Sequence, residues 1–206
     1  MSERILLLDD EHGITQALSR LLRVGLADLM GPQDGGLQVE AYNDPQAALQ
    51  RASNTAFALA VSDYRMPQMN GVEFLTALRQ LQPDCVRVIL SGYTDLNGLM
   101  AAINQAGIAR FVPKPWQDHE LLCALRDLLH IRRLDLENRQ LADLARVQSG
   151  QLSPQELERR RLEALEPGIT HVEWTADGAI VLDGVELPEA WSSIAPPLTP
   201  PDKEPR

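Results

Sequence analysis

Aromatic side chains are scarce in this sequence, where Phe, Tyr and Trp make up 4% of the 206 residues. Because 44% of the residues are nevertheless hydrophobic, we expect a core built mainly from aliphatic side chains. Cysteine is also rare, since only Cys85 and Cys123 occur, without CxxC spacing. This excludes a disulfide framework and a cysteine-ligated zinc site. Both cysteines are expected to be small core residues.

Long hydrophobic runs are missing as well. No run approaches the roughly 18 residues of a membrane-spanning helix, and the N-terminal segment MSERILLLDD is too short and acidic for a signal peptide. We therefore expect a cytoplasmic protein with no membrane partner.

Positive charge is not in excess anywhere. The net charge is −10, with 10 basic and 15 acidic residues up to His130 and 9 and 14 beyond it, so each part carries −5. Binding to a phosphate backbone depends on clustered Lys and Arg. We therefore expect no nucleic-acid partner, although an acidic domain can still carry a local basic patch.

Five short aliphatic runs alternate with segments of helical periodicity. Val, Ile and Leu dominate these runs, which lack polar alternation and are typical of strands buried on both faces of a parallel sheet. The runs are Ile5–Leu8, Leu37–Tyr42, Ala56–Ser62, Val86–Leu90 and Arg110–Val112. Between them, apolar residues recur at helical spacing, and a fourth helix is expected around Leu96–Ile103. The alternation predicts an α/β fold with a doubly wound parallel sheet.

The fifth helix is expected to begin near Gln117 and to continue past the end of a compact domain, because no proline or glycine occurs before Gly150. Leu134, Leu141 and Leu144 fit heptad spacing, but Glu137 and Gln148 interrupt the apolar seam. Two interpretations stay open: a helix folded back on its own domain, or a coiled-coil or dimerisation element.

The remaining chain divides at glycine and proline residues. Ser153 and Glu156 form a predicted capping box for a short helix from Pro154 to about Leu165. Asp177-Gly178, between two β-prone runs, predicts a hairpin. The resulting division is a domain over 1–130, a helical extension over 131–150, a short helix plus β-hairpin over 151–194, and a disordered proline-rich tail over 195–206.

Polar side chains follow the predicted strands where each strand ends. Asp9 and Asp10 follow the first strand, Asp63 the third, Ser91 the fourth and Lys114 the fifth. Ligands bind beyond the carboxyl ends of strands in such sheets. Three carboxylates close together call for a compensating cation, and oxygen-only ligands suit Mg²⁺. One carboxylate could act as a nucleophile toward a phosphoryl group.

Four segments carry a family resemblance. LLLDDE (Leu6–Glu11), SDYRMPQMNG (Ser62–Gly71), ILSGYTD (Ile89–Asp95) and FVPKPW (Phe111–Trp116) resemble the signatures of two-component response-regulator receiver domains. They occur in the family's order and spacing and cover roughly residues 3–130. Their wording is most similar to receivers of HD-GYP phosphodiesterases and hydrogenase-type regulators. The resemblance implies a flavodoxin-like, CheY-like sheet in the order 2-1-3-4-5.

The resemblance also implies roles for individual residues. Asp63 would be the phosphoacceptor, and Lys114 and Ser91 would contact the phosphoryl group. Asp10 and Asp63 would bind Mg²⁺ directly, Asp9 through a water, and the Arg65 backbone carbonyl would complete the protein ligands. Ser91 and Phe111 would form the switch pair. The bond before Pro115 would be cis.

The implied partners are a sensor histidine kinase or phosphotransfer protein, a second copy of the chain and an unknown output protein. A receiver promotes its own phosphotransfer and dephosphorylation, but no conventional enzyme domain is visible. The leading hypothesis is a response regulator that signals through protein contacts or dimerisation. Alternatives are a transcriptional regulator with an atypical DNA-binding tail, a regulator acting in trans on a cyclic-di-GMP enzyme, and a tail with catalysis of its own.

Overall fold

A five-stranded parallel sheet forms the centre of the computed structural model, which describes residues 3–29, 36–92, 106–165 and 167. The strands are β1 (Glu3–Leu8), β2 (Leu37–Tyr42), β3 (Leu59–Asp63), β4 (Val86–Gly92) and β5 (Arg110–Lys114). Their order in the sheet is β2-β1-β3-β4-β5 and all pairs are parallel. The doubly wound α/β prediction is therefore confirmed.

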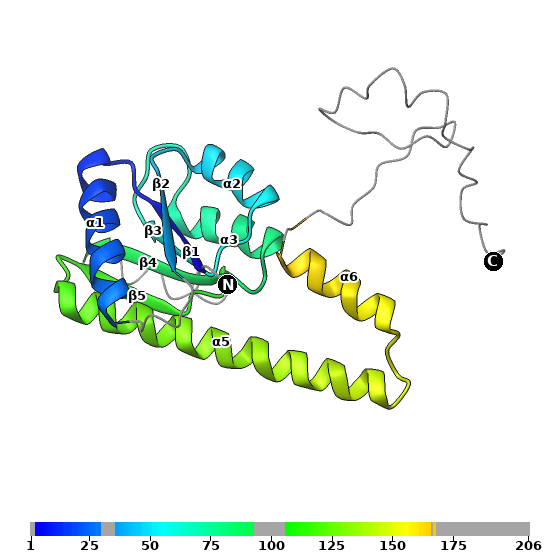
Figure 1. Cartoon of the computed structure of the whole chain (residues 1–206). Coiled ribbons are helices and arrows are strands. Elements are labelled where there is room, and N and C mark those ends of the chain that lie inside the picture. Colours follow the sequence, from blue (N-terminus) through cyan, green and yellow to red (C-terminus); the bar gives the residue numbers. More distant parts are fainter. Residues whose placement is uncertain (1–2, 30–35, 93–105, 166, 168–206) are drawn as a thin grey trace, which may run out of the picture.

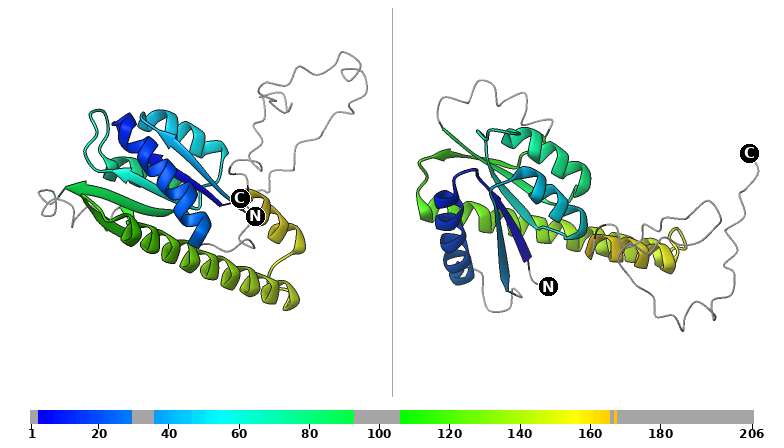
Figure 2. Two further views of the ribbon diagram at one scale, coloured as in Figure 1. Left: turned by 60° about the vertical axis from the view of Figure 1, so that its left-hand side comes forward. Right: turned by 90° about the horizontal axis from the view of Figure 1, so that it is seen from above.

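Helices cover both faces of the sheet (Figures 1 and 2). They are α1 (His12–Leu29), α2 (Pro45–Asn54), α3 (Gly71–Leu81), α5 (Asp118–Gln148) and α6 (Pro154–Leu165). The predicted fourth helix, the hairpin and the proline-rich tail lie outside the described residues.

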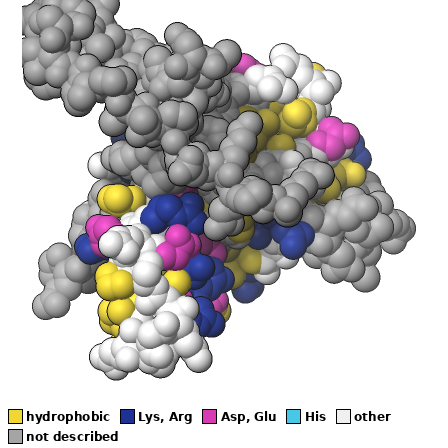
Figure 3. All heavy atoms as spheres, turned by 90° about the vertical axis from the view of Figure 1, so that its right-hand side faces the viewer, with side chains coloured by type: hydrophobic (Ala, Val, Ile, Leu, Met, Phe, Trp, Pro, Cys, Tyr) yellow, Lys and Arg dark blue, Asp and Glu magenta, His cyan; other side chains and the backbone are white. Residues whose placement is uncertain are grey.

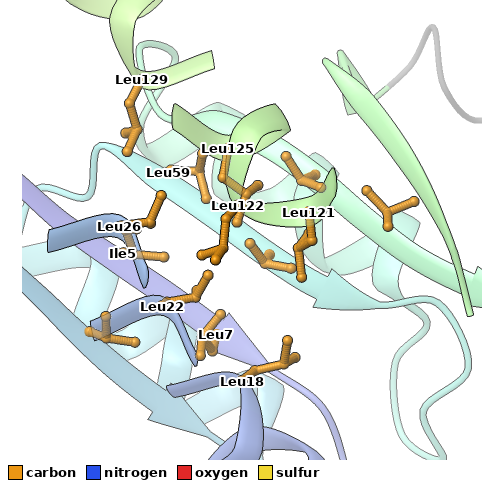
Figure 4. Close-up of a cluster of buried hydrophobic side chains, with 14 of the residues drawn as sticks. Ile5, Leu7, Leu18, Leu22, Leu26, Leu59, Leu121, Leu122, Leu125 and Leu129 are labelled. Carbon is orange, nitrogen blue, oxygen red and sulfur yellow. The ribbon is translucent and has the colours of Figure 1, made fainter. Parts of the chain in front are cut away.

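Alternate residues of β1 divide the core into two layers. Ile5 and Leu7 pack with α1 and α5, where Leu22 and Leu125 are fully buried (Figure 4). Leu6 and Leu8 pack with α2 and α3 on the other face. Strands apolar on both faces are what a sheet covered by helices on both sides requires. The expected aliphatic core is present, with Phe57 and Phe74 among its few aromatic members.

Strand ends differ from the predicted runs. The third strand begins at Leu59 instead of Ala56, because the Phe57 N–H donates to Gln82 Oε1 at the end of α3 (2.8 Å). The third, fourth and fifth strands extend to Asp63, Gly92 and Lys114. Asp63, Ser91 and Lys114 therefore belong to the strands themselves, which fixes their backbones in the hydrogen-bonded ladder.

Helix α5 runs without interruption for 31 residues, as its lack of glycine and proline predicts. Gly150 ends the helical path with a φ of 74°, a left-handed conformation that glycine tolerates. Ser153 Oγ accepts a hydrogen bond from the Glu156 N–H (3.1 Å) at the start of α6. Among the described residues, no helix combines the length and apolarity needed to cross a membrane.

The two cysteines differ in their surroundings. Cys85 is buried, as expected, and burial raises the pKa of its thiol to about 12. The core assignment is wrong for Cys123, which is only half-buried on α5, one helical turn from His119.

Candidate functional site

The carboxyl ends of β3, β4 and β5 bring the predicted site residues together. In the register, Asp63 lies opposite Leu90, Ser91 opposite Pro113, and Gly92 opposite Lys114. A cavity of about 260 Å³ opens at this edge. It is lined by Asp10, Glu11, Asp63, Tyr64, Arg65, Ser91, Gly92 and Lys114.

Lys114 joins two carboxylates. Its Nζ lies 2.8 Å from Asp9 Oδ2 and 2.5 Å from Asp63 Oδ1. The side chains of Asp9 and Asp63 are 2% and 8% exposed. Burial lowers the pKa of Lys114, but the hydrogen bonds to Asp63 and Asp9 outweigh it, so the net shift is upward. Lys114 therefore stays charged and holds the two acids together.

The cost of burying the charged Asp63 carboxylate is only partly compensated by its neighbours. Burial raises the pKa of Asp63 above its ordinary value, and the hydrogen bond and charge of Lys114 offset this only in part. Its second oxygen, Oδ2, accepts a hydrogen bond from the Arg65 N–H at 2.8 Å. Both carboxylate oxygens are thus oriented by the chain, one by Lys114 and one by the loop that follows β3.

The loop after β3 is tied to the start of α3. The Gly71 N–H donates to the Tyr64 carbonyl (2.9 Å), and Asn70 and Glu73 form a reciprocal capping box. A Cβ at position 71 would lie 2.0 Å from the Asp63 carbonyl oxygen. Only glycine therefore lets α3 approach this closely, which positions the backbone at Arg65.

Asp9 forms hydrogen bonds with neighbours that were not predicted from the sequence. Asp9 Oδ1 accepts a hydrogen bond from the Glu11 N–H (2.9 Å), and Asn43 Nδ2 donates to the Asp9 carbonyl (2.7 Å). Asn43 also donates to Thr15 Oγ1 (3.2 Å). Asn43 follows the end of β2 at the same edge of the sheet, and that position was the signal available in the sequence.

The other predicted residues take different places. Asp10 is exposed at the cavity, whereas Ser91 is buried and its Oγ donates to the Gly92 carbonyl at 3.4 Å. Phe111 is half-buried, packs against the core layer of α2 and α3, and does not line the cavity. The Lys114–Pro115 peptide bond is cis, as predicted.

The donor set suits a hard cation. Within the described part of the chain, no three His, Cys, Asp or Glu side chains form a cluster that could hold a metal ion. Asp10 and Asp63 both line the cavity, and they could hold an ion together with backbone oxygen and water. Mg²⁺ accepts such a set, because it binds through one or two carboxylates and keeps several waters. Asp9, Asp10 and Asp63 against Lys114 leave negative charge for it to neutralise.

The family model of the response regulator receiver domain matches residues 5–126 of this chain. The chain belongs to this family. Receiver domains of this family generally bind Mg²⁺ at the phosphorylation site and interact with histidine kinases or phosphotransfer proteins.

Curated relatives include regulators with further domains. The hydrogenase transcriptional regulatory protein HoxA of Cupriavidus necator is 32% identical over 154 residues, which cover 71% of this chain and 30% of HoxA. The response regulator TodT of Pseudomonas putida is 31% identical over 134 residues, covering 64% of this chain and 54% of TodT. This receiver-containing chain thus spans about a third to a half of the length of these relatives.

Solved receivers share the fold. The signal receiver domain of an HD domain-containing protein from Pseudomonas fluorescens Pf-5 is 32% identical, with a TM-score of 0.56 over 66% of this chain and 92% of that one. Full-length FixJ from B. japonicum is 27% identical, with a TM-score of 0.56 over 74% of this chain and 70% of that one. The similarity to hydrogenase-type and HD-associated receivers is therefore confirmed.

Proposed function

We propose that this chain is a response regulator whose Asp63 accepts a phosphoryl group from a sensor histidine kinase or phosphotransfer protein. One observation carries the proposal: the Asp63 carboxylate and the Lys114 ammonium form an ion pair in the lining of a cavity that Asp10 and Ser91 also line. Phosphoryl transfer depends mostly on positioning and electrostatics, and this arrangement supplies both.

In the proposed reaction, an Asp63 oxygen attacks phosphorus and forms a P–O bond. The P–N bond of the donor phosphohistidine breaks, and its electron pair stays on the imidazole nitrogen, which takes a proton from solvent. Lys114 and the Ser91 hydroxyl then contact phosphoryl oxygens. Asp10, Asp63, the Arg65 carbonyl and an Asp9-bound water would hold Mg²⁺, which would neutralise charge on the phosphoryl group. Attack by water on phosphorus breaks the P–O bond again and returns the Asp63 carboxylate.

The proposed output is a protein contact. Ser91 lies two residues along β4 from Ile89, and Ile89 lies opposite Phe111 on β5, so movement at the phosphoryl group can reach Phe111 through two adjacent strands. Phosphate would shift an equilibrium between two surfaces. The partner would be a second copy of this chain or a separate output protein.

A DNA-binding output is the second candidate, because HoxA is named a transcriptional regulator. The basic run of α6 gives it little support. Arg159 and Arg160 pair with Glu156, and Arg161 pairs with Glu158. Basic side chains stand among acidic and apolar ones on the face drawn in Figure 3. A gel shift at low salt tests this candidate, and binding that weakens steeply with salt would support it.

Phosphorylation with a small phosphodonor tests the central proposal. With acetyl phosphate and Mg²⁺, wild-type protein is expected to gain one phosphoryl group by intact mass spectrometry, and EDTA is expected to prevent this. Asp63→Asn should gain none, because the amide is no nucleophile. Asp28→Asn, at an exposed position of α1, is the matched control. Labelling of Asp63→Asn would overturn the acceptor assignment.

The output is tested by light scattering with and without beryllofluoride and Mg²⁺. Wild-type protein is expected to change in mass or in partner binding, and Asp63→Asn is not. A wild-type protein that changes in neither would contradict a phosphorylation-dependent contact.

A further inference from the structure

The face of α5 that points away from the receiver carries an exposed apolar stripe. Ile131, Leu134 and Leu141 are 55%, 45% and 64% exposed, and Asn138 and Ala145 between and after them are also exposed. These five residues, the α5 stripe, are spaced by 3, 4, 3 and 4. This is the spacing of the a and d positions of a heptad repeat.

The opposite face of the same helix is already covered. Leu136, Asp143 and Val147 are half-buried where α6 packs, and Asp143 lies 3.9 Å from Arg160 of α6. Closer to the receiver, Arg132 donates to the Asp84 carbonyl (2.9 Å) and Arg139 pairs with the Asp84 carboxylate. The receiver and α6 lie on the same side of α5 in Figures 1 and 2, so the described part of the chain leaves the α5 stripe exposed.

The residue types of the α5 stripe indicate that its binding partner is a second copy of this chain. With Ile131 at a, Leu134 at d, Asn138 at a and Leu141 at d, the pattern has a β-branched residue at a, leucine at d and one asparagine at a. This combination favours parallel two-stranded coiled coils, in which a single asparagine sets register and oligomeric state. Two copies would place Asn138 against the partner copy's Asn138, whereas an antiparallel pair would bury the amide against leucine.

The flanking charges and the preformed helix are both compatible with a parallel pair of α5 helices. In a parallel pair, His130 at g would face Asp135 at e of the other copy, and Glu137 would face Ala142, so these flanks oppose no like charges. The helix is already held by the receiver and by α6. Association therefore does not have to order a free segment, which lowers the entropy opposing it.

We propose that the α5 stripe is a self-association surface through which two copies of this chain form a parallel, in-register coiled coil over Ile131–Ala145. The partner in the proposed protein-contact output is then a second copy of this chain. Only the signalling role of this contact rests on the proposed function. The pair is short, about 22 Å for about 15 residues. Dimerisation is therefore expected to depend on concentration.

Sedimentation velocity of the full chain tests the surface. Wild type is expected to shift from monomer to dimer as its concentration rises. Leu134→Arg should weaken the dimer at least about tenfold, while Gln140→Arg, an exposed substitution on another side of α5, should leave it unchanged. Dimerisation of Leu134→Arg equal to wild type would overturn the inference. Acetyl phosphate labelling of the same variants should stay at wild-type level, so failure of the surface is distinguishable from failure of the phosphoacceptor.

Cross-linking tests the direction of pairing. In a Cys123→Ser background, Leu134→Cys is expected to form an intermolecular disulfide with oxidised glutathione, and Gln140→Cys is not. Cys85 is buried and does not interfere. A Leu134→Cys protein that dimerises without this disulfide would contradict the parallel register.

Discussion

The surroundings of Asp63 disfavour the charged form of its carboxyl group. Burial raises the pKa of Asp63, and the bridging Lys114 offsets only part of that shift. The charged form is therefore less stable in the folded chain than in the unfolded one. In the proposed phosphoryl transfer Asp63 must be charged to act as the nucleophile, so its burial lowers stability at the residue that would react.

Asp63→Asn is expected to raise the melting temperature at neutral pH in EDTA while abolishing phosphorylation. Because the folded pKa of Asp63 is raised, wild type gains stability as pH falls through that folded value toward the ordinary 3.8. The advantage of the variant should therefore shrink in acid. Thermal denaturation across pH 4 to 8 measures it, and an advantage that grows in acid would contradict the assignment.

Lys114→Met removes the cation between two nearly buried carboxylates. We expect a loss of about 2 kcal/mol in the free energy of unfolding at neutral pH, less than for a fully buried pair because Lys114 is partly exposed. Since the pKa of Lys114 is raised, its contribution in wild type is complete below the ordinary value of 10.5 and is lost as pH rises through the higher value of the folded chain. Urea denaturation measures the loss, and Lys114→Arg, which keeps the charge, should lose less.

At the scale of elements, α1 and α5 approach each other across one glycine. A Cβ at position 25 would lie 2.3 Å from Leu122 Cδ1. Gly25→Val is therefore expected to destabilise the fold by about 2 kcal/mol through overpacking. Gly13→Ala, with nothing within 4 Å of the new Cβ, is the matched control and should be neutral or stabilising.

Double-mutant denaturation decides whether the contact with Leu122 is the cause. In a Leu122→Ala background the valine has room, so Gly25→Val should be less harmful there than in wild type. Equal destabilisation in both backgrounds would place the strain elsewhere.

Element type and order were accessible from the sequence, because buried strands are apolar on both faces and each candidate site residue stands at the end of such an apolar run. Gly71 was not, since its necessity depends on the Asp63 carbonyl beside it. Asn43 was missed because its partner Asp9 is 34 residues away. On α5, the heptad prediction included Leu144 and did not include Ile131, which the structure leaves exposed. Only the placement of α6 and the receiver distinguishes the covered face from the open one.

For the whole molecule, net charge opposes association. Each copy carries −10, so a dimer brings together two acidic bodies. Screening weakens such repulsion over distances beyond about 8 to 10 Å at physiological ionic strength. We expect the dimer dissociation constant to fall as NaCl rises from about 20 to about 300 mM. Sedimentation equilibrium measures it, and a constant that rises with salt would indicate that attractive ion pairs, not the apolar stripe, hold the copies together.

Helix α5 begins four residues after Lys114 and continues as one rigid rod of 31 residues. Its length is about 46 Å, so a tilt of about 5° at its base moves its far end by about 4 Å. The ties of Arg132 and Arg139 to Asp84 lie part-way along this rod and hold it against the receiver. Mechanically, a rotation near the first turn of α5 would be carried along the rod to the end that packs with α6.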